Sequence, residues 1–344
     1  MSETPKHIGY IDTLKGIAII LVVVGHALAW NFKDPVAAIQ SSEKSDMLWW
    51  YIIYAFHMPL FFWVSGFLLP RDNLDGKSLL NVMWRRTYTL LIPFITAGLL
   101  LNYISSGGGF RYWFLRSLYE LVIISLIYEA VRYRFKLGVI CDILFYLILF
   151  VIIRVCYKIG GNTIMENIFE LKRLSLTNYM GFVIGMFCRR YSPLFSLFMK
   201  NHTYTIGLIL FSVLIGFSLS SVDIPMLKYV MPLCSISGIA CVVYLAVNKI
   251  KDDSIYTKVL HYLGRHSLEI YILHMYFQFR CFEISEYALM MMHSDNFRDV
   301  FWGQTCMLLT SFVEALLMIG LSLFVMNIIR MSNVLSVVLF GRRN

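Results

Sequence analysis

Two ionisable side chains, Lys15 and His26, stand at opposite ends of an apolar run near the N-terminus. In a helix of about 100° per residue they fall within about 20° of each other, roughly 16 Å apart along the axis. That separation is about half the thickness of a bilayer's hydrocarbon core. An ionisable group inside a membrane-length helix costs at least about 2.5 kcal/mol, which makes both residues functional candidates. A neutral imidazole can take a proton from a hydroxyl or act as a nucleophile, so the pattern indicates acid–base or nucleophilic chemistry.

Further polar side chains interrupt other apolar segments. His57 lies about three turns inside the second segment, where its imidazole could share a level with His26. His274 follows Tyr271 by one turn in a late apolar segment, and Ser65 lies in the inner half of the second segment. Each has a structural alternative, because buried histidines and small residues also join helices by hydrogen bonds and close packing.

Arg85 and Arg86 precede the third apolar segment, shortly before Pro93. Cations at the cytoplasmic mouth of a membrane protein suit a ligand that carries phosphate, although flanking arginines also set topology. No Ser-His-Asp motif, nucleophile elbow or HExxH motif is present, and no Cys/His cluster indicates a metal. Histidine-assisted transfer within the membrane is therefore one enzymatic option, and the residues alone do not separate it from transport.

The composition places the chain among integral membrane proteins. Its hydrophobic fraction is 58%, only 15% of its residues are charged, and apolar stretches recur throughout its length. The net charge of +9 does not indicate nucleic-acid binding, because many of the cations flank apolar segments, as loop residues that contact anionic lipid do. The seven cysteines stand singly, which argues against a disulfide framework.

The hydropathy pattern predicts an all-α polytopic membrane protein with about ten transmembrane helices. The predicted spans are 13–31, 48–69, 87–105, 113–131, 137–156, 174–188, 203–221, 228–248, 266–291 and 302–329. The larger share of the 30 Lys and Arg residues then lies on the side of the N-terminus, which predicts cytoplasmic N- and C-termini. We expect residues 1–344 to form a single integral membrane domain.

Three motifs resemble membrane-bound acyltransferase family 3, the O-acetyltransferases of bacterial surface polysaccharides and related acceptors. The first runs from Ile11-Asp12-Thr13-Leu14-Lys15 to His26 and matches a basic residue, ten intervening positions and a histidine. The second, 56–67, reads FHMPLFFWVSGF and is similar to the family's helix-2 signature. The third, 263–274, reads LGRHSLEIYILH and resembles its late helix ending in Tyr-x-x-His.

The resemblance implies acetyl-CoA as a co-substrate, with no permanently bound cofactor, and a glycan or lipid-linked sugar hydroxyl as acceptor. It implies a central catalytic role for His26, with Lys15 as the paired cation, and we expect His57 and Ser65 to join the catalytic group. The expected donor-binding residues are Lys15, Arg85, Arg86, Tyr271 and His274. The family usually has a further cation just before Leu-x-x-Pro, where this chain has Thr89.

Two classes of function therefore remain open on the sequence. The preferred one is an O-acyltransferase, most simply an O-acetyltransferase, of the bacterial cytoplasmic (inner) membrane, acting on envelope polysaccharide or glycolipid. The alternative is a transporter or flippase whose intramembrane histidines relay protons. The expected partners are an acyl-CoA, the sugar acceptor and membrane lipids, but no nucleic acid. The sequence leaves the oligomeric state open, a homo-oligomer included.

Overall fold

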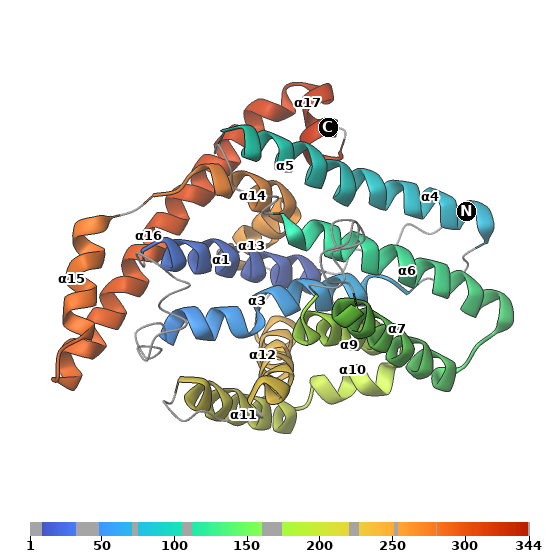
Figure 1. The fold of residues 1–344 in the computed structure, drawn as a ribbon, viewed down its shortest axis with the longest axis horizontal. Helices are drawn as coiled ribbons and strands as arrows, with labels where there is room; N and C mark the ends of the chain where they lie inside the picture. Colours follow the sequence, from blue (N-terminus) through green and yellow to red (C-terminus); the bar gives the residue numbers. More distant parts are fainter. Residues whose placement is uncertain are drawn as a thin grey trace. The chain divides into compact units, whose positions relative to one another are not determined.

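The computed structural model describes residues 9–31, 48–70, 75–104, 112–159, 174–219, 227–250, 254–279 and 281–342. Within these ranges every regular element is a helix, and no strand occurs (Figure 1). The all-α prediction is therefore confirmed for the described part of the chain. An all-helical design suits a bilayer, because a helix satisfies its own backbone hydrogen bonds without water.

Several of the described helices are long and apolar enough to cross a membrane. By length and composition these are α1 (Gly9–Asn31), α3 (Leu48–Phe67), most of α12 (Leu227–Asn248) and α16 (Phe297–Arg330). A fifth span results if α10 (Ser192–Phe198) and α11 (Asn201–Leu219), which meet at 64°, count as one. Ten spans and two cytoplasmic termini stay predictions.

The chain divides into two compact units, and each combines segments that are distant in the sequence. The first unit comprises Met1–Val64 and Pro193–Met326, and the second comprises Ser65–Ser192 and Asn327–Asn344. The divisions fall inside α3, α10 and α16, so each of these helices contributes to both units. That residues 1–344 act as one domain stays a prediction.

Helix α1 is the central helix of the first unit. Its neighbours there are α12, α13 (Ile255–Arg265) and α14 (Ser267–Leu273). Two glycines bring α1 and α13 into backbone contact: a Cβ on Gly16 would lie 2.2 Å from the carbonyl oxygen of Leu260, and one on Gly264 would lie 2.0 Å from that of Asp12. Only glycine permits such an approach, so these positions set the spacing of the two helices.

The second unit contains a buried network of charged side chains. Its helical elements are α4 (Gly76–Arg86), η2 (Thr87–Leu91), α5 (Ile92–Ile104), α6 (Trp113–Phe135), α7 (Val139–Ile159), α9 (Leu176–Arg190) and α17 (Asn333–Phe340). Arg190 pairs with Glu129 of α6 and, at 2.7 Å, with Asp142 of α7. The hydroxyl of Tyr191 donates to the same Asp142 at 2.6 Å. Buried charges need such partners, and the network ties α6, α7 and α9 together.

The prediction of one continuous helix over 266–291 is wrong. The helix α14 gives way to the 3₁₀ turn η4 (His274–Tyr276), and a new helix, α15 (Phe282–Met292), follows after the chain has left helical conformation. The carboxylate of Glu314 accepts a hydrogen bond from the backbone N–H of Cys281 at 2.9 Å. A side-chain acceptor thus satisfies a backbone donor at the start of α15, which makes the interruption tolerable in an apolar setting.

The third predicted helix, 87–105, is preceded by a helix that the prediction missed. Helix α4 begins after Asp75, whose carboxylate caps the helix by accepting from the backbone N–H of Ser78 at 2.9 Å. Hydrogen bonds from the side chain and the backbone of Ser78 lower the pKa of the Asp75 carboxyl below its usual range. None of the α4 residues is buried, so a search for apolar stretches overlooks this helix.

A wide turn, η2, joins α4 to α5 just before Pro93. At its end the backbone N–H of Ile92 donates to the carbonyl of Thr87, five residues earlier. A proline has no N–H and its ring clashes with the carbonyl four residues before it, here that of Thr89. The wider π-type turn relieves this conflict, so the helix continues through Pro93.

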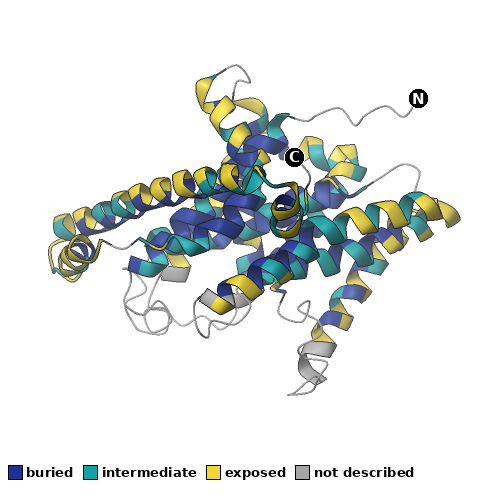
Figure 2. Cartoon of the chain, turned by 90° about the horizontal axis from the view of Figure 1, so that it is seen from above, coloured by how far each residue is buried: buried dark blue, intermediate teal, exposed yellow. Residues whose placement is uncertain are grey.

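Burial follows helical periodicity along individual helices (Figure 2). In α16 the buried residues recur every three or four positions between 303 and 326. They include the polar side chains Ser311, Glu314 and Ser322, each almost completely buried. A polar row on the packed face of an otherwise apolar helix indicates specific hydrogen bonding rather than contact with lipid.

Candidate active site

The structure joins His26 of α1 directly to His274. The Nδ1 atom of His26 lies 2.8 Å from Nε2 of His274, and the two imidazole rings stack with their centroids 5.0 Å apart. His274 is completely buried, whereas His26 is half-buried. The first unit therefore contains a histidine pair, and only its His26 member retains exposed surface.

The hydrogen bonds of the pair determine which ring nitrogens carry protons. The Nδ1 atom of His274 lies 3.0 Å from the carbonyl oxygen of Ile270, which can only accept, so this nitrogen is the donor. A neutral His274 then presents an unprotonated Nε2, and Nδ1 of His26 must donate to it. The Nε2 atom of His26 is left with its lone pair. That atom is the one able to act as a base or a nucleophile.

His57 lies in the same unit and shows the same local arrangement. Its Nδ1 donates to the carbonyl oxygen of Ile53 at 2.8 Å, so Nε2 carries the lone pair here too, and the side chain is 2% exposed. Gly25 brings α1 and α3 together at this level, because a Cβ there would lie 3.0 Å from the ring of Tyr54. The edge of the His57 ring meets that same ring, with centroids 4.7 Å apart.

Aromatic rings flank the histidine pair. The ring of Tyr271 lies 5.9 Å from that of His274, and Tyr271 is itself buried. The ring of Trp30, one turn further along α1, lies 5.7 Å from that of His26. The predicted site residues His26, Tyr271 and His274 therefore come together, with a tryptophan that the sequence analysis did not single out.

Lys15 lies at the other end of α1, as expected from its position in the helix. Its ammonium group is 4.0 Å from the carboxylate of Asp12, and its side chain is 29% exposed. One turn of helix separates the two residues, so this pair is local to the start of α1. The structure places a paired but accessible cation about three turns before His26.

The remaining predicted site residues, Ser65, Arg85 and Arg86, belong to the second unit. Ser65 is half-buried, and the neighbouring Gly66 packs against α9, where a Cβ would lie 2.0 Å from the carbonyl oxygen of Phe182. Arg85 is exposed and Arg86 is half-buried at the end of α4. Gly66 thus has a packing function, and the roles of the three predicted residues stay predictions.

Thr89, which stands where the resembling family usually has a cation, is part of the wide turn η2. Its hydroxyl is 3.5 Å from the carbonyl oxygen of Arg86. Gly341, at the end of α17, packs on the same stretch, since a Cβ there would lie 2.8 Å from the Cα of Thr89. Gly341 also has a φ of 64°, which favours glycine.

Two polar contacts in the first unit escaped the sequence analysis. The Nε2 atom of His261, on α13, lies 3.0 Å from the hydroxyl of the buried Thr13. Glu314 on α16 accepts a hydrogen bond at 2.6 Å from the amide of Asn31, the last residue of α1. The partners of both are distant in the sequence, so spacing alone could not have found them.

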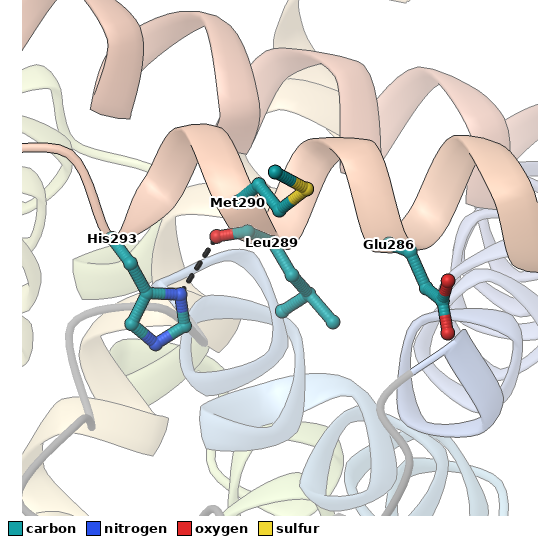
Figure 3. Close-up of a pocket in the computed structure, with 4 residues that line it drawn as sticks. All are labelled: Glu286, Leu289, Met290 and His293. Atoms are coloured by element: carbon teal, nitrogen blue, oxygen red, sulfur yellow. Dashed lines mark hydrogen bonds between the residues drawn. The ribbon is translucent and has the colours of Figure 1, made fainter.

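A separate hollow lies along α15. It is a largely open depression of about 520 Å³, lined by Glu286, Leu289, Met290 and His293. Figure 3 shows these side chains on one face of the helix, where Nδ1 of His293 donates to the carbonyl oxygen of Leu289 at 2.7 Å. None of the predicted site residues lines it, so this hollow is distinct from the histidine pair.

Comparison with protein families identifies the class of the chain. Residues 8–331 match the model of an acyltransferase domain, and the match spans nearly the whole chain. The protein therefore belongs to acyltransferase family 3, and together with its apolar helices this makes it a membrane acyltransferase. Searches of curated proteins and of solved structures found no match.

Proposed function

We propose that this acyltransferase moves an acyl group, most simply acetyl, from cytosolic acyl-CoA to a hydroxyl of a cell-envelope glycan or glycolipid. The observation that carries the proposal is the hydrogen-bond chain from His26 through His274 to the carbonyl of Ile270. It leaves Nε2 of His26 unprotonated on a half-buried side chain. The resemblance to the surface-polysaccharide O-acetyltransferases supports acetyl as the group and a sugar alcohol as the acceptor.

In the direct route His26 acts as a general base. Its Nε2 takes the proton of the acceptor hydroxyl while that oxygen attacks the thioester carbonyl carbon. The new C–O bond forms, the C–S bond breaks, and the departing CoA thiolate recovers the proton from the imidazolium. His274 stabilises this imidazolium by accepting its Nδ1–H at 2.8 Å, as the third member of a catalytic triad does.

In the covalent route the same Nε2 attacks the thioester carbon and CoA leaves as its thiolate. The acceptor hydroxyl then attacks the acyl-imidazolium, and its proton passes to the thiolate. Rapid-quench experiments with radiolabelled acetyl-CoA in the absence of acceptor distinguish the routes. Label bound to the protein indicates the covalent route, and its absence from a preparation that acetylates fully once acceptor is added indicates direct transfer.

Cations on the predicted cytoplasmic side support the donor end of the proposal. Lys15 remains accessible beside Asp12, and Arg85 and Arg86 end α4 with at least part of their surface exposed. Guanidinium and ammonium groups bind phosphate oxygens by charge-assisted hydrogen bonds, and CoA carries several such groups. We assign donor binding to these three residues.

Two further predicted residues receive new or narrower roles. His57 offers a second buried Nε2 with a lone pair, which suits it to the covalent route: while Nε2 of His26 is acylated, it can take the proton of the acceptor hydroxyl and pass it to the CoA thiolate. The direct bond of His274 to His26 supports a role in orienting the catalytic ring, in place of the donor-binding role suggested by the sequence. Tyr271 and Ser65 keep their predicted roles as donor-binding and catalytic residues.

The reaction itself is tested with purified protein in proteoliposomes. Supplied with acetyl-CoA inside and an envelope glycan outside, it should release free CoA and add the mass of one acetyl group per CoA to the glycan. Transport of the glycan without release of CoA would refute the proposal in favour of the transporter reading, which the family match does not favour.

A further inference from the structure

Glu314 is a buried carboxylate that the proposed chemistry does not use. Its side chain is 1% exposed, and it stands on the apolar helix α16, one turn after Ser311. A charge in such a position is rare unless it has a function. Each of its two oxygens accepts a different donor: Oε2 accepts from the amide Nδ2 of Asn31 at 2.6 Å, and Oε1 accepts from the backbone N–H of Cys281 at 2.9 Å.

Those two donors belong to the two chain segments that carry the histidine pair. Asn31 ends α1, five residues after His26, and Cys281 immediately precedes α15, seven residues after His274. Five residues of helix correspond to a rotation of about 140°, so α1 presents His26 to η4 and Asn31 to α16. The amide of Asn31 also donates to the hydroxyl of Ser311 at 3.0 Å, so Asn31 makes two hydrogen bonds to α16.

The segment after His274 needs such an external attachment. The helix α14 ends there in the short 3₁₀ turn η4, and the chain then leaves helical conformation at Phe277. A segment of this kind lacks the continuous backbone hydrogen bonds that keep a long helix straight. The bond from Cys281 to Glu314 fixes its far end to α16, and the bond from Asn31 fixes α1 to the same carboxylate.

Resting on the proposed function, we infer that Glu314 is a positioning residue for the catalytic histidine. It clamps the end of α1 and the start of α15 to α16, and so maintains the 2.8 Å bond between His26 and His274. The clamp acts through hydrogen bonds and not through charge. A misplacement of about 1 Å at a reacting group can lower a rate by roughly 100-fold, so the spacing of the pair matters for turnover.

Three variants test the clamp. In Glu314→Ala both bonds are lost. In Glu314→Gln both can be kept, because the amide oxygen accepts from Cys281 and the Asn31 amide can turn to accept from the new N–H. The matched control is Ser322→Ala on the same helix, since Ser322 is buried but its hydroxyl donates only to the carbonyl of Met318 in its own helix.

We expect Glu314→Ala to lower kcat by at least about 100-fold while KM for acetyl-CoA stays within about threefold of wild type. Glu314→Gln should restore kcat to within about threefold of wild type, and Ser322→Ala should match wild type. The clamp is refuted if Glu314→Ala turns over like the control, or if a folded Glu314→Gln is as slow as Glu314→Ala.

A second measurement makes the test independent of turnover. Nitrogen-15 spectra of labelled histidine, assigned by comparison with His26→Gln, report whether Nδ1 or Nε2 of His26 carries the proton. Wild type and Glu314→Gln should show the proton on Nδ1 alone, and Glu314→Ala should show a mixture of both tautomers. An unchanged tautomer in Glu314→Ala contradicts the clamp. Absence of acetyl transfer by the wild type would instead contradict the proposed function and leave this spectroscopic test valid.

Discussion

Replacement of His274 by alanine removes the hydrogen-bond acceptor of the Nδ1–H of His26. It leaves Nε2 of His26, the atom proposed to react, in place. The lost contact is a 2.8 Å hydrogen bond that becomes a bond to a charged imidazolium during the reaction. Such bonds contribute about 1.5–3 kcal/mol. At 1.36 kcal/mol for each factor of ten, the loss corresponds to a kcat lower by roughly 10- to 150-fold. KM for acetyl-CoA should change little, because His274 acts in the chemical step, after acetyl-CoA has bound.

His274→Gln is the conservative companion of this variant. A glutamine side chain can place its amide oxygen near the position of the imidazole Nε2, so it still accepts the proton of His26. We expect this variant to recover most of the activity. The control is His261→Ala, which likewise deletes an imidazole, here a half-buried one, and one hydrogen bond near α1, the bond to Thr13.

The assay is acetyl transfer by purified variants in proteoliposomes at equal protein content. A kcat of His274→Ala equal to that of His261→Ala would contradict the acceptor role of His274. A folded His274→Gln that is as inactive as His274→Ala would also contradict it, because an acceptor at this position would then not restore activity. Thermal unfolding in detergent verifies that each variant is folded.

Three further outcomes follow from the contacts described. Gly264→Ala should lower the unfolding temperature strongly, because its Cβ would lie 2.0 Å from a backbone oxygen of α1, whereas Gly320→Ala has open space and should be harmless in the same melting experiment. Replacing Arg85 and Arg86 together by glutamine should raise KM for acetyl-CoA and leave kcat largely intact, and an unchanged KM would remove them from the donor site. Lys15→Met should likewise raise KM for acetyl-CoA. An equal rise of this KM in Lys15→Arg would indicate that the position of the ammonium group matters, and not its positive charge alone.

Hydropathy predicted most of the helices well but could not show where they are interrupted. The ends of α1 and α3 agree with the predicted spans within a few residues. The break after His274 was missed because no glycine or proline marks it, and its stability depends on Glu314, which lies far away in the sequence. Helix α4 was missed because none of its residues is buried.

The candidate site was predicted in part. His26 could be singled out because an ionisable residue in an apolar helix has few structural explanations. Its pairing with His274 could not be predicted, because a hydropathy profile indicates depth in the membrane but not the rotation of each helix. The same limitation applies to the contact between Glu314 and Asn31, because these residues are 283 positions apart in the sequence.

The central claim is that Nε2 of His26 performs the chemistry. The most direct measurement compares wild type with His26→Ala in proteoliposomes that contain acetyl-CoA, at matched abundance and matched unfolding temperature. We predict that the variant still binds acetyl-CoA but transfers no acetyl group to the glycan above the rate of protein-free vesicles. Acetyl transfer by folded His26→Ala at a rate near that of wild type would contradict it.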